Sequence, residues 1–410
     1  MSGKTYKLIG IGLIALFLSH CATSSTGRKE FTQSLTATPQ QSQYFKENLA
    51  STSINQVALL LPLSGPHQQF ARIIQEGFLY AYYQAKRQNP NLSVQVYDTA
   101  GDVSVTKLYQ QAIEEGAQFI VGPLSKNDVD HVANLSDSKI RVPTLLLNQP
   151  SSTRELSTGL FVISLTPEYE MQFIASNLSK KGLQKAALLS SQDALGERLT
   201  KAFSDAFSQL QGNSVAKLSI TPKADKSAAI QQLLALDLSQ KRYQTVQQLL
   251  KRKIEFQPRR RQDLDVIVLM TTPEQGRELK PLFDFYYAEA LPVYASSLIY
   301  QGETAPKKDR DLSGITFCDM PFLLSSNPEW QRARATFYQT ALQADKPYPR
   351  LYALGMDAFT LSQQLNAVFM AQKTGWPAAT GALFLDSNNT IYRRLSWATI
   401  KEGNAVLVQQ

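Results

Sequence analysis

Short apolar runs alternate with stretches of helical periodicity from about residue 56 onward. The run "VALLLPL" is followed by "FARIIQEGFLYAYYQAK", in which apolar side chains recur every three or four positions. The same order returns with "LSVQVYDT" before "VTKLYQQAIEEGA", and with "LDVIVLMTT" before "PEQGRELKPLFDFYYAEA". Short apolar strands separated by helices of roughly 10 to 18 residues are typical of an α/β protein with parallel sheets.

The expected strands are too many for one comfortable sheet, and no repeat of fixed period is visible. The sequence therefore predicts two doubly wound lobes with parallel sheets. We expect residues 56–163 and about 292–350 to form lobe 1, and residues 164–291 and about 351–410 to form lobe 2.

The first residues differ from the body in charge and hydropathy. A basic stretch, "MSGKTYK", precedes the apolar run "LIGIGLIALFLS" and then Cys21. The run has the length of a signal peptide, whereas a membrane span needs about 20 apolar residues. This boundary resembles a bacterial lipoprotein signal, which implies that residues 1–20 are removed and that Cys21 carries the lipid. An ordinary secretory signal with a chance cysteine is the alternative, because His20 stands where a small residue is usual.

Residues 22–55 are rich in Ser, Thr and Gln, a composition typical of flexible segments. We therefore expect residues 21–55 to form a flexible, lipidated tether. In lipoproteins that stay in the inner membrane, Asp usually follows the lipidated cysteine. Ala22 stands there in this chain, so the resemblance implies a lipid anchor on the periplasmic face of the outer membrane.

Basic residues concentrate in one segment. The chain has a formal net charge of +8, and positions 241–261 hold eight Lys or Arg residues against Glu255 alone. An exported protein rarely meets nucleic acid, so we expect no nucleic-acid partner. The segment indicates either an anionic partner outside the cytoplasm or a solvated helix face. The residues expected to contact a partner are Lys251, Arg252, Lys253, Arg259, Arg260 and Arg261.

The same segment contains apolar residues at helical spacing. One stripe along the expected helix predicts that the helix packs on the body and shows its charges outward. The stripe consists of Val246, Leu249, Leu250 and Ile254.

Small and hydrogen-bonding residues follow several of the expected strands. In doubly wound sheets, ligands bind beyond the carboxyl ends of the strands, so these residues would face a cleft suited to a small polar ligand. Two alternatives stay open, namely that the residues only form turns and helix caps, or that the cleft is inherited and empty. The expected cleft residues are Ser64, Gly65, Ser125, Asn148, Thr166 and Ser296.

Catalytic signatures are scarce in this chain. The sequence contains no nucleophile elbow, phosphate-binding loop or zinc-protease motif. After signal removal only His67 and His131 remain, too few for a zinc cluster of paired His and Cys. Cys318, in the apolar "GITFCDMPF", is expected to be an inert buried thiol. We therefore expect no enzymatic activity, no cofactor and no metal.

Several longer motifs follow one another in order over about residues 56–405. They include "VALLLPLSGP", "FIVGPLSKNDV", "VPTLLLN", "ISLTPEYE", "EFQPRRRQDLDVIVLMTTPEQGRELKP", "DLSGITFCDMPFLL" and "ATGALFLDSNNTIYRRLSWATI". Their order and spacing resemble the LppC/LpoA family of penicillin-binding protein activators. The resemblance implies a fold like that of type I periplasmic binding proteins, with two lobes joined by several crossovers.

Two functions remain open at this point. The resemblance implies a non-enzymatic outer-membrane lipoprotein that binds a class A penicillin-binding protein, activates it and so regulates peptidoglycan synthesis and cell shape. The alternative is a periplasmic protein that binds or senses a small molecule, such as an amino acid or a muropeptide. A hydrolase has no motif in its favour.

Overall fold

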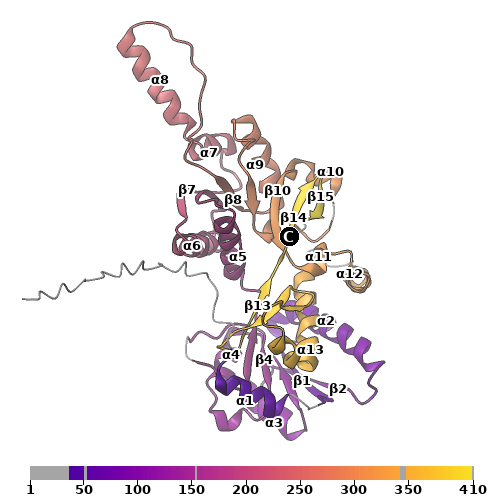
Figure 1. Ribbon diagram of the computed structural model, residues 1–410. Coiled ribbons are helices and arrows are strands. Elements are labelled where there is room, and N and C mark those ends of the chain that lie inside the picture. Colours follow the sequence, from indigo (N-terminus) through magenta and orange to yellow (C-terminus); the bar gives the residue numbers. More distant parts are fainter. Residues whose placement is uncertain (1–36, 50–52, 153–154, 304, 342–347, 409–410) are drawn as a thin grey trace, which may run out of the picture.

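Two sheets flanked by helices form two lobes in the computed structural model (Figure 1). The structure describes residues 37–49, 53–152, 155–303, 305–341 and 348–408. The expected signal peptide and Cys21 lie outside these residues. The α/β class and the two-lobed arrangement predicted from the alternation of apolar strands and helices are confirmed.

Lobe 1 is built on an eight-stranded sheet with the order β11-β12-β13-β5-β4-β3-β1-β2. Helices α2 (Gln68–Lys86) and α13 (Pro349–Met370) pack into one buried cluster of the lobe, and α3 (Val105–Glu114) and α4 (Lys126–Ala133) pack into another. The strands are β1 (Gln56–Leu61), β2 (Ser93–Asp98), β3 (Phe119–Val121), β4 (Thr144–Leu146), β5 (Leu160–Ile163), β11 (Trp376–Pro377), β12 (Ala382–Leu385) and β13 (Thr390–Arg394).

Lobe 2 is built on a seven-stranded sheet with the order β15-β14-β10-β9-β8-β6-β7. Its strands are β6 (Lys185–Ser191), β7 (Asn213–Ile220), β8 (Val266–Met270), β9 (Val293–Ala295), β10 (Ile315–Asp319), β14 (Ser396–Lys401) and β15 (Asn404–Leu407). Its helices are α5 (Pro167–Lys180), α6 (Ala194–Gln209), α7 (Lys226–Leu233), α8 (Leu236–Leu250), α9 (Pro273–Phe285), α10 (Pro306–Asp309), α11 (Pro321–Leu324) and α12 (Pro328–Ala341). Short 3₁₀ turns are η1 (Gly65–His67), η2 (Asp137–Lys139), η3 (Ser297–Ile299) and η4 (Arg310–Leu312).

Both sheets are mostly parallel, with antiparallel strands toward one edge. In lobe 1, β12 pairs antiparallel with β11 and with β13, while β13 pairs parallel with β5. In lobe 2, β14 pairs antiparallel with β10 and with β15. The apolar runs of the central strands reflect burial on both faces, since all residues of β8 are buried.

The expected lobe boundaries are wrong for the second half of the chain. Residues 292–350 were expected in lobe 1, but β9 and β10 extend the sheet of lobe 2 by parallel pairing with β8 and with each other. Residues 351–394, expected in lobe 2, supply α13 and the edge of the sheet of lobe 1. Only Leu395 separates β13 from β14, so the chain passes from one sheet into the other almost as one strand.

The expected tether also contains folded structure. Residues Pro39–Asn48 form helix α1, whose start is fixed by a reciprocal capping box between Thr38 and Gln41. The ring of Phe45 is 2% exposed and stacks on Phe369 of α13 with 4.1 Å between ring centroids. The prediction of a flexible segment is therefore wrong for residues 37–49. The buried ring of Phe45 holds this polar helix on lobe 1, together with the Gln41 amide, which donates to the carbonyl of Asp386 at 2.8 Å and to Asn389 Oδ1 at 2.6 Å.

Helices α2 and α13 cross with their backbones in contact. A Cβ atom at Gly77 would lie 2.0 Å from the carbonyl oxygen of Tyr352, and one at Gly355 would lie 2.0 Å from that of Ile74. Only glycine allows this approach. The contact lets α13 reach both cores, because Tyr352 packs in the cluster of lobe 2 and Phe359 in that of lobe 1.

Candidate functional site

Ser64 and Gly65 form a turn that is held from the neighbouring strand. The carboxylate of Asp98, at the end of β2, accepts hydrogen bonds from the backbone N–H groups of Leu63 (2.8 Å) and Ala100 (3.0 Å), and Ser64 donates to it as well. Partial burial opposes ionisation, but these hydrogen bonds prevail and lower the pKa of Asp98. Gly65 has a φ of +71°, which favours glycine. The Asp98 carboxylate therefore fixes the conformation of this turn.

Ser125 and Asn148 also serve their own loops. The hydroxyl of Ser125 accepts from the backbone N–H of Asp128 at 3.2 Å and donates to the Asp128 carboxylate at 2.6 Å, which caps α4. The Asn148 amide donates to the carbonyl of Leu124 at 3.2 Å and accepts from the N–H of Gln149 at 2.9 Å. Ser125 therefore caps its own helix, whereas Asn148 ties the loop after β4 to the loop after β3.

Thr166 and Ser296 lie on different elements. Thr166 precedes α5, and its hydroxyl lies 2.6 Å from that of Ser164, which also accepts from Gln149 at 3.3 Å. Ser296 follows β9, is 1% exposed, and its hydroxyl has no hydrogen-bond partner among the described residues. Asn148 and Thr166 are thus linked through Gln149 and Ser164. Ligand binding by the six expected cleft residues stays a prediction.

A buried polar cluster joins elements of the two lobes, and the sequence analysis missed it. The guanidinium of Arg350, in the first turn of α13, donates to both carboxylate oxygens of Asp319 at 3.0 and 2.5 Å. It also donates to the carbonyls of Ser297 (3.0 Å) and Tyr300 (2.8 Å). Asp319 ends β10 and is 1% exposed. The only signals in the sequence were an aspartate inside an apolar strand and an arginine at the start of an apolar helix.

Glu170 of α5 completes this cluster. Its carboxylate accepts from the backbone N–H of Ser297, and from the Ser297 hydroxyl at 2.7 Å. Burial raises the pKa of Glu170 to about 7, although the hydrogen bonds from Ser297 act in the opposite direction. The carboxylate is enclosed and its acceptors are occupied, which is the geometry of a structural junction.

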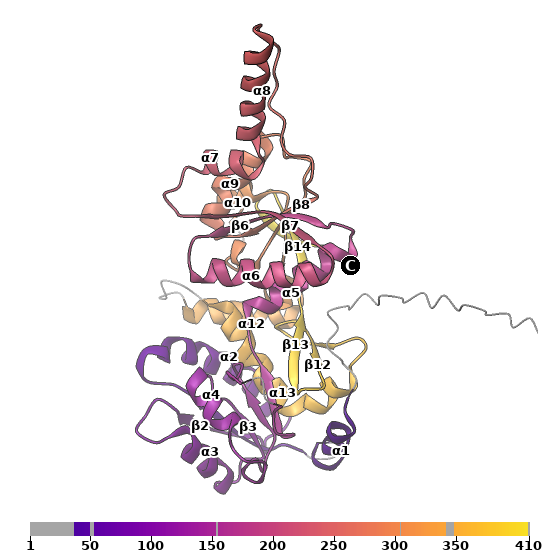
Figure 2. The ribbon, with the colours of Figure 1, turned by 90° about the vertical axis from the view of Figure 1, so that its left-hand side faces the viewer.

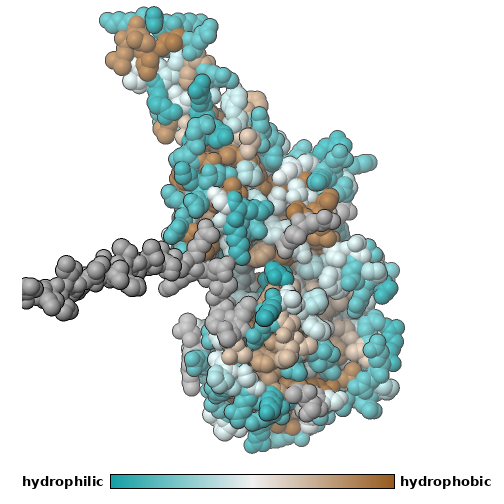
Figure 3. All heavy atoms as spheres, viewed as in Figure 1, coloured by the Kyte–Doolittle hydropathy of each residue, from teal (hydrophilic) through white to brown (hydrophobic). Residues whose placement is uncertain are grey.

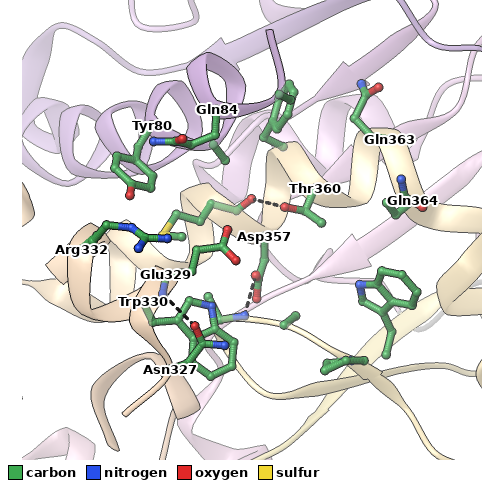
Figure 4. Close-up of a pocket in the computed structure, with 18 of the residues that line it drawn as sticks. Tyr80, Gln84, Asn327, Glu329, Trp330, Arg332, Asp357, Thr360, Gln363 and Gln364 are labelled. Carbon is green, nitrogen blue, oxygen red and sulfur yellow. Dashed lines mark hydrogen bonds between the residues drawn. The ribbon is translucent and has the colours of Figure 1, made fainter. Parts of the chain in front are cut away.

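An open groove of about 830 Å³ lies between α2, α12, α13 and β11 (Figure 4). Its floor includes Asp357, whose carboxylate accepts from the N–H groups of Ala379 (2.8 Å) and Thr380 (2.7 Å) and is thereby fixed. Burial raises the pKa of Asp357 to about 6. Aromatic rings and amide side chains line the walls, a mixture suited to polar or protein ligands. They include Tyr80, Gln84, Gln88, Asn327, Trp330, Gln363, Gln364 and Trp376. None of the expected cleft residues lines this groove.

The basic segment forms an arm that projects from lobe 2 (Figures 1 and 2). We define the arm as α8 together with the return segment 251–261. At its base, the backbone N–H of Arg261 donates to the carbonyl of Leu234 at 2.8 Å, and the guanidinium of Arg260 donates to the carbonyl of Tyr287 at 2.9 Å. Arg261 also binds Asp263 through two hydrogen bonds, which lower the pKa of that aspartate. Arg260 and Arg261 therefore fasten the arm.

The far end of the arm carries the other expected contact residues. Lys251, Arg252 and Lys253 are exposed there, and Arg259 is exposed along the return segment. The prediction that the apolar stripe packs on the body is wrong. Three of its members are exposed, because α8 extends beyond lobe 2 and no described residue covers its outer turns. The exposed fractions are 45% for Val246, 77% for Leu249 and 50% for Leu250.

Metal-ligating side chains do not gather at one place in the part of the chain that the structure describes. It contains no cluster of three or more His, Cys, Asp or Glu residues able to hold a metal ion. Cys318 is fully buried, as expected, and burial raises the pKa of its thiol. Within the same residues, no helix is both long and apolar enough to span a membrane.

A family model described as "LppC putative lipoprotein" matches residues 35–403. Among curated relatives, the penicillin-binding protein activator LpoA of Vibrio vulnificus (strain YJ016) is 30% identical over 346 residues, which are 83% of this chain and 56% of the relative. The activator LpoA of Vibrio antiquarius (strain Ex25) is 29% identical over 361 residues, 86% of this chain and 58% of the relative. The chain thus spans little more than half the length of these relatives.

Solved structures give the same assignment. Full-length LpoA from Haemophilus influenzae matches with 25% identity and a TM-score of 0.66, covering 90% of this chain and 61% of that one. The C-domain of LpoA (YraM) from the same organism, described as a regulator of PBP1A, matches with 26% identity and a TM-score of 0.63, covering 86% of this chain and all of the domain. A branched-chain amino acid transporter protein from Chromobacterium violaceum, at 24% identity over 84% of this chain and 99% of that one and a TM-score of 0.58, shares the fold alone.

Proposed function

This chain belongs to the LppC family, and from that premise we propose that it is a non-enzymatic outer-membrane lipoprotein that binds and activates a class A penicillin-binding protein. The observation that carries the proposal is the match to the C-domain of Haemophilus influenzae LpoA, which is covered from end to end at 26% identity. That domain is described as a regulator of PBP1A. A body that corresponds to a whole regulatory domain is expected to act on a synthase of the same class.

Activation without catalysis requires differential binding. An activator shifts its target toward an active conformation only if it binds that conformation more tightly than the inactive one. A tenfold shift in the population of the synthase needs a difference of about 1.4 kcal/mol. A few contacts on a rigid surface can supply such a difference in binding free energy. The pair of Arg350 and Asp319 contributes to this rigidity, because it joins α13 to β10.

An outer surface of the body is the proposed point of contact. Apart from the Ser296 hydroxyl, the polar groups at the strand ends form hydrogen bonds within their own loops. Asp98 and Ser125 are examples. The cationic arm and the aromatic groove of Figure 4 lie outside those loops. Of the two, the arm offers charge for steering toward an anionic partner.

The partner is tested by direct binding. The purified protein, in mild detergent, is titrated against the class A penicillin-binding protein of the same cell, and its affinity is compared with that for a class B enzyme. Saturable binding to the class A enzyme alone supports the proposal. No binding to either enzyme, by a protein with a cooperative thermal transition, contradicts it.

The lipid anchor is tested separately at Cys21. The Cys21→Ala variant is expected to lose incorporation of labelled palmitate and to leave the outer-membrane fraction, because the thiol that carries the lipid is gone. Cys318→Ala is the matched control, since that thiol is buried and removed from any modifying enzyme. An unchanged outer-membrane fraction for Cys21→Ala would refute the anchor.

A further inference from the structure

The arm is a self-supporting projection with an uncovered end. Its two legs hold each other through the ring of Tyr243, which stacks on Phe256 with 4.3 Å between centroids, and through the Tyr243 hydroxyl, which donates to the carbonyl of Ile254 at 3.3 Å. Closer to the base, the backbone N–H of Arg259 donates to the Ser239 hydroxyl at 3.2 Å. These contacts fix the helix against its return segment and so present the end of the arm in a defined orientation.

The end of the arm combines exposed apolar side chains with unpaired cations. We define the arm tip as Val246, Leu249 and Leu250 together with 251–253. The three apolar residues follow the spacing i, i+3, i+4 and therefore share one face of α8. Lys251, Arg252 and Lys253 form no ion pair in the described part of the chain, unlike Arg261 at the base. Figure 3 shows hydrophobic residues gathered at this end of α8 beside hydrophilic ones.

Exposed apolar side chains lie next to one another at the arm tip. Leu249 is 77% exposed and Leu250 50% exposed, although both could have been polar without loss to the fold. Contiguous exposed apolar residues rimmed by charge mark interaction sites. An amphipathic helix that offers anchors at this spacing fits an apolar recess on another protein.

We propose that the arm tip is the element that docks on the synthase, by inserting Leu249 and Leu250 into an apolar recess surrounded by acidic side chains. This inference rests on the proposed function and deepens it by naming the contact. The net positive charge of 251–253 requires an acidic rim on the partner for complementarity. The inference divides the arm into two parts. Arg260 and Arg261 attach its base to lobe 2, and the arm tip binds the partner.

The position of the arm favours a protein over the membrane of the anchor. The chain enters the folded body at α1 on lobe 1, whereas α8 projects from the opposite end of the molecule, on lobe 2 (Figures 1 and 2). An anchor that precedes α1 is therefore attached at the end of the molecule opposite the arm tip. The apolar face is also short for a helix that lies in a membrane interface, and it lacks Trp or Phe.

The test uses the purified protein and two tip variants, Leu249→Asp/Leu250→Asp and Lys251→Glu/Arg252→Glu/Lys253→Glu. Both variants should retain the thermal midpoint of the wild type, because the substituted side chains are exposed. Each is expected to weaken binding to the purified class A penicillin-binding protein by at least tenfold. The charge variant should also flatten the dependence of affinity on salt concentration, since its cations no longer steer association. Met370→Asp is the matched control, because Met370 is 75% exposed but lies on lobe 1.

The outcomes separate this inference from the proposed function. Binding by the wild type and by Met370→Asp, with a loss in both tip variants, supports the arm tip as the contact. Binding by all four proteins with equal affinity overturns the arm tip and leaves the activator function standing. No binding by the wild type overturns both. Tip-dependent flotation with anionic phosphatidylglycerol vesicles, or tip-dependent self-association, without any tip-dependent binding of the synthase, would also overturn the inference.

Discussion

Replacing Arg350 by Met removes the cation that ties α13 to β10 while keeping much of the side-chain volume. The substitution leaves the carboxylate of Asp319 buried, at 1% exposure, without the two hydrogen bonds of 3.0 and 2.5 Å that now neutralise it. It also leaves the carbonyls of Ser297 and Tyr300 without their shared donor. An unpaired buried charge is among the costliest defects in a protein interior.

The expected loss of stability follows from this geometry. Removing one partner of a buried ion pair costs about 3–5 kcal/mol. The side chain of Arg350 retains 27% exposure, so water can relieve part of the loss and about 3 kcal/mol is the expected cost. With an unfolding entropy of about 2.1 cal/mol/K per residue and about 360 described residues, the thermal midpoint should fall by about 4 °C. Differential scanning calorimetry at pH 7.5 measures this shift.

Arg198→Met is the matched control for this substitution. Arg198 also donates two hydrogen bonds to one carboxylate, that of Glu168, but its side chain is 59% exposed. Surface pairs contribute at most about 1 kcal/mol, so the midpoint of the control should change by about 1 °C or less. Equal shifts for the two variants, or no shift for Arg350→Met, would refute the assignment of Arg350 to a buried junction.

Three further predictions concern other parts of the body. The Glu170→Gln variant should gain melting temperature relative to wild type as pH rises from 5 to 8. Burial, assisted by the charge of Asp319 and opposed by Arg350, raises the folded-state pKa of Glu170 to about 7. Wild-type stability therefore falls through this window as the folded state loses its extra proton, and a pH-independent difference would contradict this. Gly355→Ala should lower the free energy of unfolding in urea by about 1–3 kcal/mol, because the added Cβ would meet the carbonyl of Ile74. This loss should outweigh the better helix propensity of alanine, and unchanged stability would exclude the backbone contact. Phe45→Ala should weaken the packing of α1 on lobe 1 by about 3 kcal/mol, because the stacked ring is removed. Limited proteolysis should then cut within residues 37–49 faster, and an unaltered cleavage rate would show that the ring does not hold the helix.

The sequence predicted the elements better than their partners. Strands such as β1 are recognisable because a parallel strand covered on both faces appears in the sequence as an apolar run. The sheet that a strand joins depends on pairing over long distances, and β9 was therefore assigned to the wrong lobe. Helix α1 escaped notice because its composition is polar, although Thr38 and Gln41 carry a capping signal that was available in the sequence.

The site was less predictable than the fold. Periodicity identified the apolar face of α8, but only the structure shows that Leu249 is 77% exposed among the described residues. The basic run was equally visible, yet local sequence could not separate Arg261, which is paired with Asp263, from Lys251, which is exposed at the tip. The pair of Arg350 and Asp319 joins residues 31 positions apart on different lobes, and no local pattern encodes such a contact.

Activation of a class A penicillin-binding protein is the core of the proposed function. The most direct measurement is the rate at which that purified enzyme polymerises and cross-links lipid II, with and without an excess of this protein, in the same detergent. We expect a higher rate that saturates with the concentration of this protein, and no product when it is present alone. A rate that stays constant while the two proteins bind each other, or that stays constant without any binding, would contradict the claim.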